Sequence, residues 1–181
     1  MNDSPVSSGK HASLLSFLLT IVLVMAGSVY LLKTAYSSDP LWFWPNFEEM
    51  PVQVVIQCHG RTNILEGTAP EAKNISALVN QQISGKKRFD PLSLTDATYT
   101  YYQTDPGVVT LELFYAGPVR IHMASMHFTN ITSLLIPLEG RYADTATVFG
   151  LIDRRPSGGS IHMDSNQPII EYLSGLGLCS K

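Results

Sequence analysis

The sequence lacks the motifs from which an enzymatic activity is most often inferred. It contains no G-x-S-x-G turn of hydrolases, no phosphate-binding P-loop and no G-x-G-x-x-G loop of dinucleotide-binding proteins. Charged residues make up 15% of the chain and the formal net charge is −3, so no basic stripe for nucleic acid is expected. These absences predict a protein that is neither an enzyme nor a partner of nucleic acid.

Cysteine is also scarce, because the chain holds only Cys58 and Cys179. Two thiolates cannot form a zinc cluster by themselves. Cys58 is followed by His59, but neighbours on a strand point to opposite faces, which argues against a thiolate–imidazole pair. If the domain is exported we expect a Cys58–Cys179 disulfide; in a reducing compartment the alternative is two buried thiols.

One long run without charge stands out against this background, over residues 12–32. A helix of roughly 20 apolar residues crosses a bilayer core of about 30 Å. The alternatives are a retained signal-anchor and a cleaved signal peptide. The run exceeds the ~7–15 residues of a signal-peptide core, which favours the anchor. Lys10 and the free amine precede the run, which favours a cytoplasmic N-terminus and an extracytoplasmic C-terminal domain, periplasmic in a bacterial host.

The run divides the chain into four parts. We expect a short tail over residues 1–11, a transmembrane signal-anchor over 12–32, a juxtamembrane linker over 33–50 and an exported domain over 51–181. The linker contains Trp42, Phe43 and Trp44, whose rings are of the kind that favours the lipid headgroup region. We therefore predict a membrane-interface role for these three residues; packing inside the domain is the alternative.

Residues 51–181 mix helix-type and strand-type patterns. Apolar residues follow a helical period after Pro70, and a last helix is expected from Ile169. Strands are expected over residues 52–57, 97–103, 108–116, 119–128, 133–138, 145–152 and 161–163, with a loop over 154–160. The predicted fold class is α+β: an N-terminal transmembrane helix followed by an antiparallel β-meander with two helices, or alternatively a partly open barrel.

The stretch IHMASMHF, residues 121–128, is the part of the chain most suggestive of a metal site. On a strand, each face would carry one histidine and one methionine about 13 Å apart, too far to share one ion. A site would need ligands from several strands, and the candidates are His59, His122, Met126, His127 and His162. Imidazole with thioether favours copper. The alternative is that these side chains pack or hydrogen-bond within the fold, with no cofactor.

Aromatic and methionine side chains also fall on the second face of the expected sheet. They are Tyr102, Phe114, Met126 and Phe128. Exposed, such residues are typical of partner-binding surfaces, although a helix covering that face is the alternative. We expect a single-pass, membrane-anchored, non-enzymatic accessory, assembly or stabilising subunit that contacts a membrane or exported protein. The alternatives are a copper-binding or delivery protein and a sensor domain that binds a small apolar ligand and partners a membrane-bound regulator.

Overall fold

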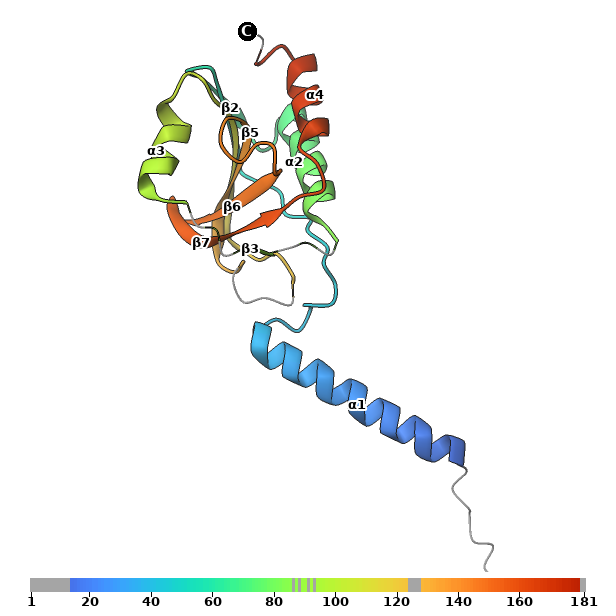
Figure 1. Cartoon of the computed structure of the whole chain (residues 1–181). Coiled ribbons are helices and arrows are strands. Elements are labelled where there is room, and N and C mark those ends of the chain that lie inside the picture. The colour runs from blue at the N-terminus through green and yellow to red at the C-terminus, as the bar shows by residue number, and fades with distance from the viewer. Residues whose placement is uncertain are drawn as a thin grey trace, which may run out of the picture.

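The computed structural model describes residues 14–85, 87, 89–90, 92, 94–123 and 128–179. Within them the chain forms helices and strands in the order α1 (Leu14–Ser37), β1 (Gln53–Cys58), β2 (Arg61–Glu66), α2 (Pro70–Ile83), β3 (Phe89–Asp90), α3 (Asp96–Thr104), β4 (Val109–Val119), β5 (Ile131–Glu139), β6 (Thr147–Ile152), β7 (Arg155–His162) and α4 (Gln167–Gly175). Helix α1 projects from the rest, and the other elements form the domain (Figure 1).

The described strands form one seven-stranded sheet in the order β2-β1-β4-β5-β6-β7-β3. Every neighbouring pair is antiparallel. Strands β4 to β7 follow one another as a meander, and the β1–β2 hairpin extends the sheet beyond β4. The sheet is not closed, since β2 and β3 lie at its two ends. The α+β class is confirmed, and the barrel alternative is not.

The sheet lies between two layers of helix, with α2 and α4 on one face and α3 on the other (Figure 1). The larger core lies on the α2–α4 side, where Ile75, Val79 and Leu173 pack against alternate residues of the strands, such as Leu111 and Leu113. A smaller cluster lies under α3 and is formed by Leu94, Tyr102, Leu135, Phe149 and Leu151. The sheet is therefore buried on both faces at its centre.

Residues 97–103, expected as a strand, form helix α3 instead, so three helices follow α1 rather than two. Thr95 caps the helix by accepting a hydrogen bond from the Thr98 N–H at 3.1 Å. Tyr99, Tyr102 and Gln103 are three and four residues apart, which places them on one helical face towards the sheet. The spacing of Tyr99, Tyr101 and Tyr102 is compatible with both a strand and a helix. In the structure the segment is a helix, which buries Tyr102 against the sheet.

The structure differs from the sequence predictions at three other places. Strand β4 ends at Val119, and residues 120–123 are not part of a strand, while residues 124–127 lie outside the described part. The predicted loop over 154–160 belongs mostly to strand β7, which pairs with β6. Strand β2 was not predicted, because its sequence RTNILE is polar at an exposed edge and has little of the apolar alternation of a half-buried strand.

Candidate functional site

The sheet is only partly covered on the α3 side. Helix α3 packs over residues of β5 and β6 and contacts β4 and β7. Across the register Ile64, Val55 and Glu112 lie opposite one another and share this side of the sheet. Glu112 is buried, whereas Val55 is half-buried and Ile64 is 58% exposed. The part of the sheet that α3 covers therefore ends between β4 and β2.

We call the uncovered surface the open face. It consists of Gln53, Val55 and Gln57 of β1, Thr62, Ile64 and Glu66 of β2, and Phe114 of β4. Phe114 is half-buried, and the Arg154 guanidinium lies 5.4 Å from the centre of its ring. Strand β2 ends the sheet, and no described strand pairs with its outer edge. The open face thus borders a strand edge that can accept another strand.

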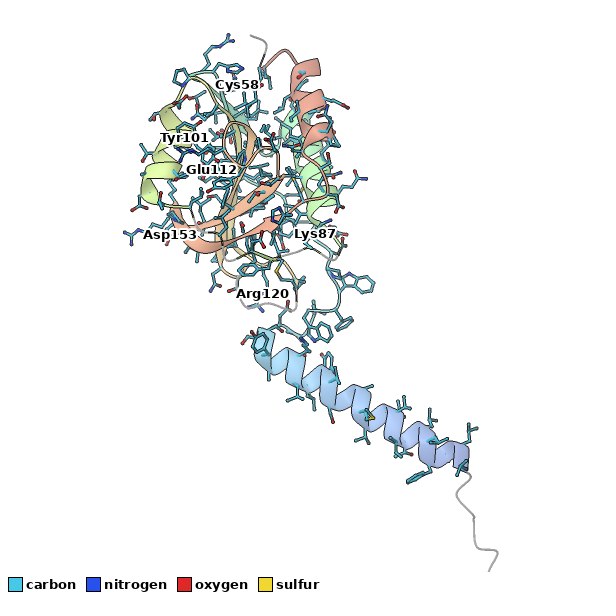
Figure 2. The ribbon with its side chains drawn as sticks, viewed as in Figure 1. Cys58, Lys87, Tyr101, Glu112, Arg120 and Asp153 are labelled. Atoms are coloured by element: carbon cyan, nitrogen blue, oxygen red, sulfur yellow. A yellow bond between two sulfur atoms is a disulfide. The ribbon has the colours of Figure 1, made fainter. Side chains whose placement is uncertain are left out.

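A buried carboxylate, Glu112, lies where the cover ends (Figure 2). It accepts hydrogen bonds from the Tyr99 hydroxyl at 3.3 Å and the Gln103 amide at 3.2 Å, both on α3, and from the Ser133 hydroxyl at 2.9 Å on β5. Burial raises the pKa of Glu112, and these hydrogen bonds and the charge of Arg154 offset part of that effect. The cluster fastens α3 to the sheet and so fixes the border of the open face.

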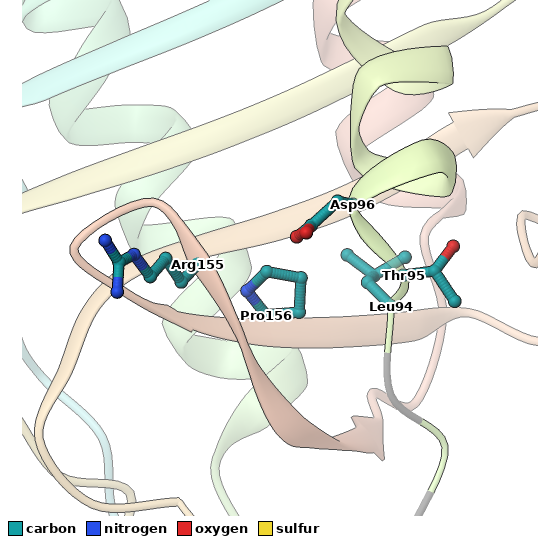
Figure 3. Close-up of a pocket in the computed structure, with 5 residues that line it drawn as sticks. All are labelled: Leu94, Thr95, Asp96, Arg155 and Pro156. Carbon is teal, nitrogen blue, oxygen red and sulfur yellow. The ribbon is translucent and has the colours of Figure 1, made fainter.

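A hollow lies at the N-terminus of α3, with a volume of about 750 Å³. It is lined by Leu94, Thr95, Asp96, Arg155 and Pro156, and Figure 3 shows the Asp96 carboxylate directed towards the hairpin that carries Arg155 and Pro156. An anion bound there would meet the Asp96 carboxylate as well as the Arg155 guanidinium. The mixed charge therefore does not make a matched anion site.

The histidines predicted as metal ligands are not brought together. His59 lies 3.8 Å from Glu139 and His122 lies 2.9 Å from Asp39. His162 lies 2.5 Å from Asp90. Met126 and His127 lie outside the described residues. Within the described part no group of three or more His, Cys, Asp or Glu side chains is placed to hold a metal ion. The described histidines are each engaged with a separate carboxylate instead.

The four residues predicted for the interaction surface do not lie together either. Tyr102 of α3 is fully buried between its helix and the sheet, and it donates its hydroxyl hydrogen to the Arg141 carbonyl. Phe128 is fully buried in the larger core against Phe89, with ring centres 6.3 Å apart. Met126 is among the residues not described. Of the three that the structure describes, Phe114 alone lies on an accessible surface, the open face.

The loop after β4 contacts the end of α1. Asp39 is 2% exposed, and both of its carboxylate oxygens lie within 3.1 Å of His122 Nδ1. Arg120 donates a hydrogen bond to the Ser38 carbonyl at 2.6 Å, and Figure 2 shows Arg120 at the end of the domain next to α1. We call these four residues the joint. His122 of the IHMASMHF stretch thus belongs to a connection between helix and domain, whereas Ile121 and Met123 belong to the larger core or pack against it.

The segment expected as a linker is mostly exposed but is tied to the domain at several points. Phe47 is 2% exposed and contacts Tyr115 with ring centres 6.1 Å apart. The Gly85 N–H donates to the Pro45 carbonyl, and the Asn80 side chain donates to the Glu49 carbonyl at 3.0 Å. Residues 38–49 therefore join α1 to the sheet through fixed contacts.

The expected disulfide is present between Cys58 and Cys179. It joins the end of β1 to the segment after α4, across a sequence separation of 121 residues. The sequence did not indicate the Glu112 cluster or the joint. A signal for the first is the single glutamate between Leu111 and Leu113 in an apolar strand.

Comparisons with protein-family models, curated proteins and solved structures found no match for this chain.

Proposed function

We propose that this protein is a single-pass, membrane-anchored, non-enzymatic accessory or stabilising subunit that binds another membrane or exported protein through its open face. The observation that carries this proposal is the uncovered end of the sheet, where Ile64 is 58% exposed on β2, whose outer edge pairs with no described strand. An exposed isoleucine on an unpaired edge strand is a feature that natural proteins usually cover or replace by charge.

Strand addition is the binding mode that this surface favours. β2 is six residues long, and four consecutive residues, Thr62 to Leu65, carry no charge. A partner strand along about 20 Å of edge would gain main-chain hydrogen bonds, and alternate side chains would contact the open face. Arg61 and Glu66 stand at opposite ends of β2, so a partner with the complementary charge order would be favoured in one direction.

The anchor in this proposal is α1. The helix has 24 residues and is long and apolar enough to cross a membrane, a property that signal sequences share. Two observations support a retained helix: it continues to Ser37, and the following Asp39 is buried against the domain. The disulfide supports an oxidising compartment for the domain. We place the N-terminal tail in the cytoplasm and the domain outside it.

The proposal is tested by extracting the full-length protein from its native membrane in mild detergent and measuring its native and denatured mass. We compare the wild type with Ile64→Lys and with Ile152→Lys. Ile152 is the matched control, because it is also a strand isoleucine and is 37% exposed, but it lies on β6, away from the open face.

We expect the wild type and Ile152→Lys to be extracted with a second chain at fixed stoichiometry, and Ile64→Lys to be extracted alone with an intact disulfide. A wild-type protein that is extracted alone would contradict a role as a subunit. Retention of the second chain by Ile64→Lys would place the contact outside the open face. The denatured mass shows whether α1 is retained.

A further inference from the structure

The turn that follows α1 folds back along the helix. The Tyr30 hydroxyl donates a hydrogen bond to the Pro40 carbonyl at 3.3 Å, and the rings of Tyr30 and Phe43 lie 6.1 Å apart. Tyr30 precedes the last residue of α1, Ser37, by seven residues, which corresponds to about 10 Å along the helix axis. Residues 40–44 therefore lie beside the last two turns of α1.

This position corresponds to the boundary of the apolar part of the helix. The uncharged run ends at Lys33, and Tyr30 lies three residues inside that charge, or roughly 4–5 Å. With the uncharged run in a bilayer core of about 30 Å, Tyr30 and the neighbouring Phe43 lie at the junction of acyl chains and headgroups. Tyrosine and tryptophan concentrate at this depth in membrane proteins.

The surface of the turn is apolar and open. Leu41 is 46% exposed, Phe43 is 53% exposed and Trp44 is 62% exposed. Residues 40–47 contain no charged side chain. The preceding carboxylate, Asp39, is held inside the joint by His122. Three neighbouring apolar side chains next to an apolar helix form one continuous surface.

The backbone of the turn is largely satisfied from within. The N–H groups of Leu41, Trp42 and Trp44 donate to the Asp39 carboxylate, the Asp39 carbonyl and the Leu41 carbonyl respectively. Pro40 and Pro45 have no N–H group to satisfy. Backbone that leaves water without unpaired donors loses little free energy.

We propose that residues 40–44 insert into the membrane interface of the leaflet from which α1 emerges. This inference rests on the proposed anchoring by α1 and adds a second, lipid-binding site to it. Together with the joint, the inserted turn holds the domain at a fixed height and orientation above the bilayer. The open face is thereby presented at a defined distance from the membrane.

The chain offers its own probe, because its two tryptophans are Trp42 and Trp44. The full-length protein is reconstituted into phosphatidylcholine vesicles whose acyl chains carry bromine either close to the headgroup or close to the methyl end. Flotation of the vesicles is measured on the same samples. The variants Trp42→Phe and Trp44→Phe separate the two signals. The control is Leu176→Trp in the doubly substituted background, since Leu176 is 37% exposed after α4, at the end of the domain away from α1 (Figure 1).

We expect emission at shorter wavelength than in water and a loss of intensity that is larger with bromine close to the headgroup. The loss should be greater for Trp44 than for Trp42, because Trp44 is the more exposed ring. The Leu176→Trp control should show no loss. Protein that floats with the vesicles without quenching, or with stronger quenching by the deep bromines, overturns the inference and leaves the anchor intact. Protein that does not float overturns both.

Discussion

Removing the disulfide should lower the stability of the domain by an amount that follows from its place in the chain. Reduction of wild-type protein breaks the Cys58–Cys179 bond without changing any side-chain volume other than two added hydrogens. The bond closes a loop with a sequence separation of 121 residues. The loop-closure relation, −2.1 − 1.5R ln n, gives an entropy of about −16 cal/mol/K, or about 5 kcal/mol at 25 °C.

That amount is large compared with the total stability of a domain, which is typically about 5–15 kcal/mol. The segment most affected is α4, because Cys179 follows it closely and the helix contributes Ile169 and Leu173 to the larger core. Without the bond, α4 is held to the domain by packing and by two side-chain hydrogen bonds, from Asn74 to the Tyr172 hydroxyl and from Asn166 to the Ala143 carbonyl. We therefore expect hydrogen exchange to rise first in α4 and β1 and later in β4 and β5.

The assay is a urea titration of the full-length protein in mild detergent, with and without reductant, followed by the near-ultraviolet circular dichroism of the tyrosines. Tyr102 and Tyr115 are buried, so their signal reports on the packed domain rather than on α1. The double variant Cys58→Ala/Cys179→Ala is the control, and it should match reduced wild type apart from a small cavity at the buried Cys58. A decrease of less than about 1 kcal/mol on reduction would refute the loop-closure reasoning.

Three further changes have expected outcomes. Since the pKa of Glu112 is raised, its contribution to stability is fully present below the ordinary glutamate pKa and is lost as the pH rises through the raised value. Glu112→Gln, which cannot ionise, should therefore be more stable than wild type at neutral pH by about 1 kcal/mol in urea titrations, with no such gain at acid pH; a loss at neutral pH would contradict the reasoning. Gly67→Ala should lower the free energy of unfolding by about 1–3 kcal/mol, because the added Cβ overlaps the Pro51 carbonyl oxygen. Gly117→Ala, with open space around its Cβ, should lower it much less, and thermal unfolding of both variants measures the difference. His122→Ala should open the joint and speed proteolysis within residues 38–50; an unchanged cleavage rate would show that the joint does not depend on this histidine.

Much of the fold could be predicted from local sequence. The long uncharged run gave α1, and β-branched or apolar runs gave β1, β4, β5 and β6. The errors fell on elements whose structure depends on distant partners. Helix α3 depends on the packing of Tyr102 against residues of β5 and β6. Strands β2 and β7 depend on pairing with β1 and β6. Local pattern carries little information about such contacts.

The candidate site shows the same division. The disulfide was predictable because the chain has two cysteines. The strand that carries Phe114 was also predictable, and Phe114 lies half-buried on the open face, while its contact with a partner stays a prediction. The limits of the open face were not predictable, since they follow from where α3 packs. The contact between Asp39 and His122 joins residues 83 apart in the sequence, and neither residue type nor spacing marks it.

The disulfide also sets an order of events during synthesis. In an exported chain Cys58 crosses the membrane first, and its partner follows 121 residues later. The thiol must stay reduced for that interval, in a compartment that oxidises thiols. Because the chain has no third cysteine, a premature bond can form only with another molecule. Early pairing of β1 with β4 would place Cys58 opposite Val109 and begin the burial that is complete in the folded domain, which would partly shield the thiol before α4 arrives.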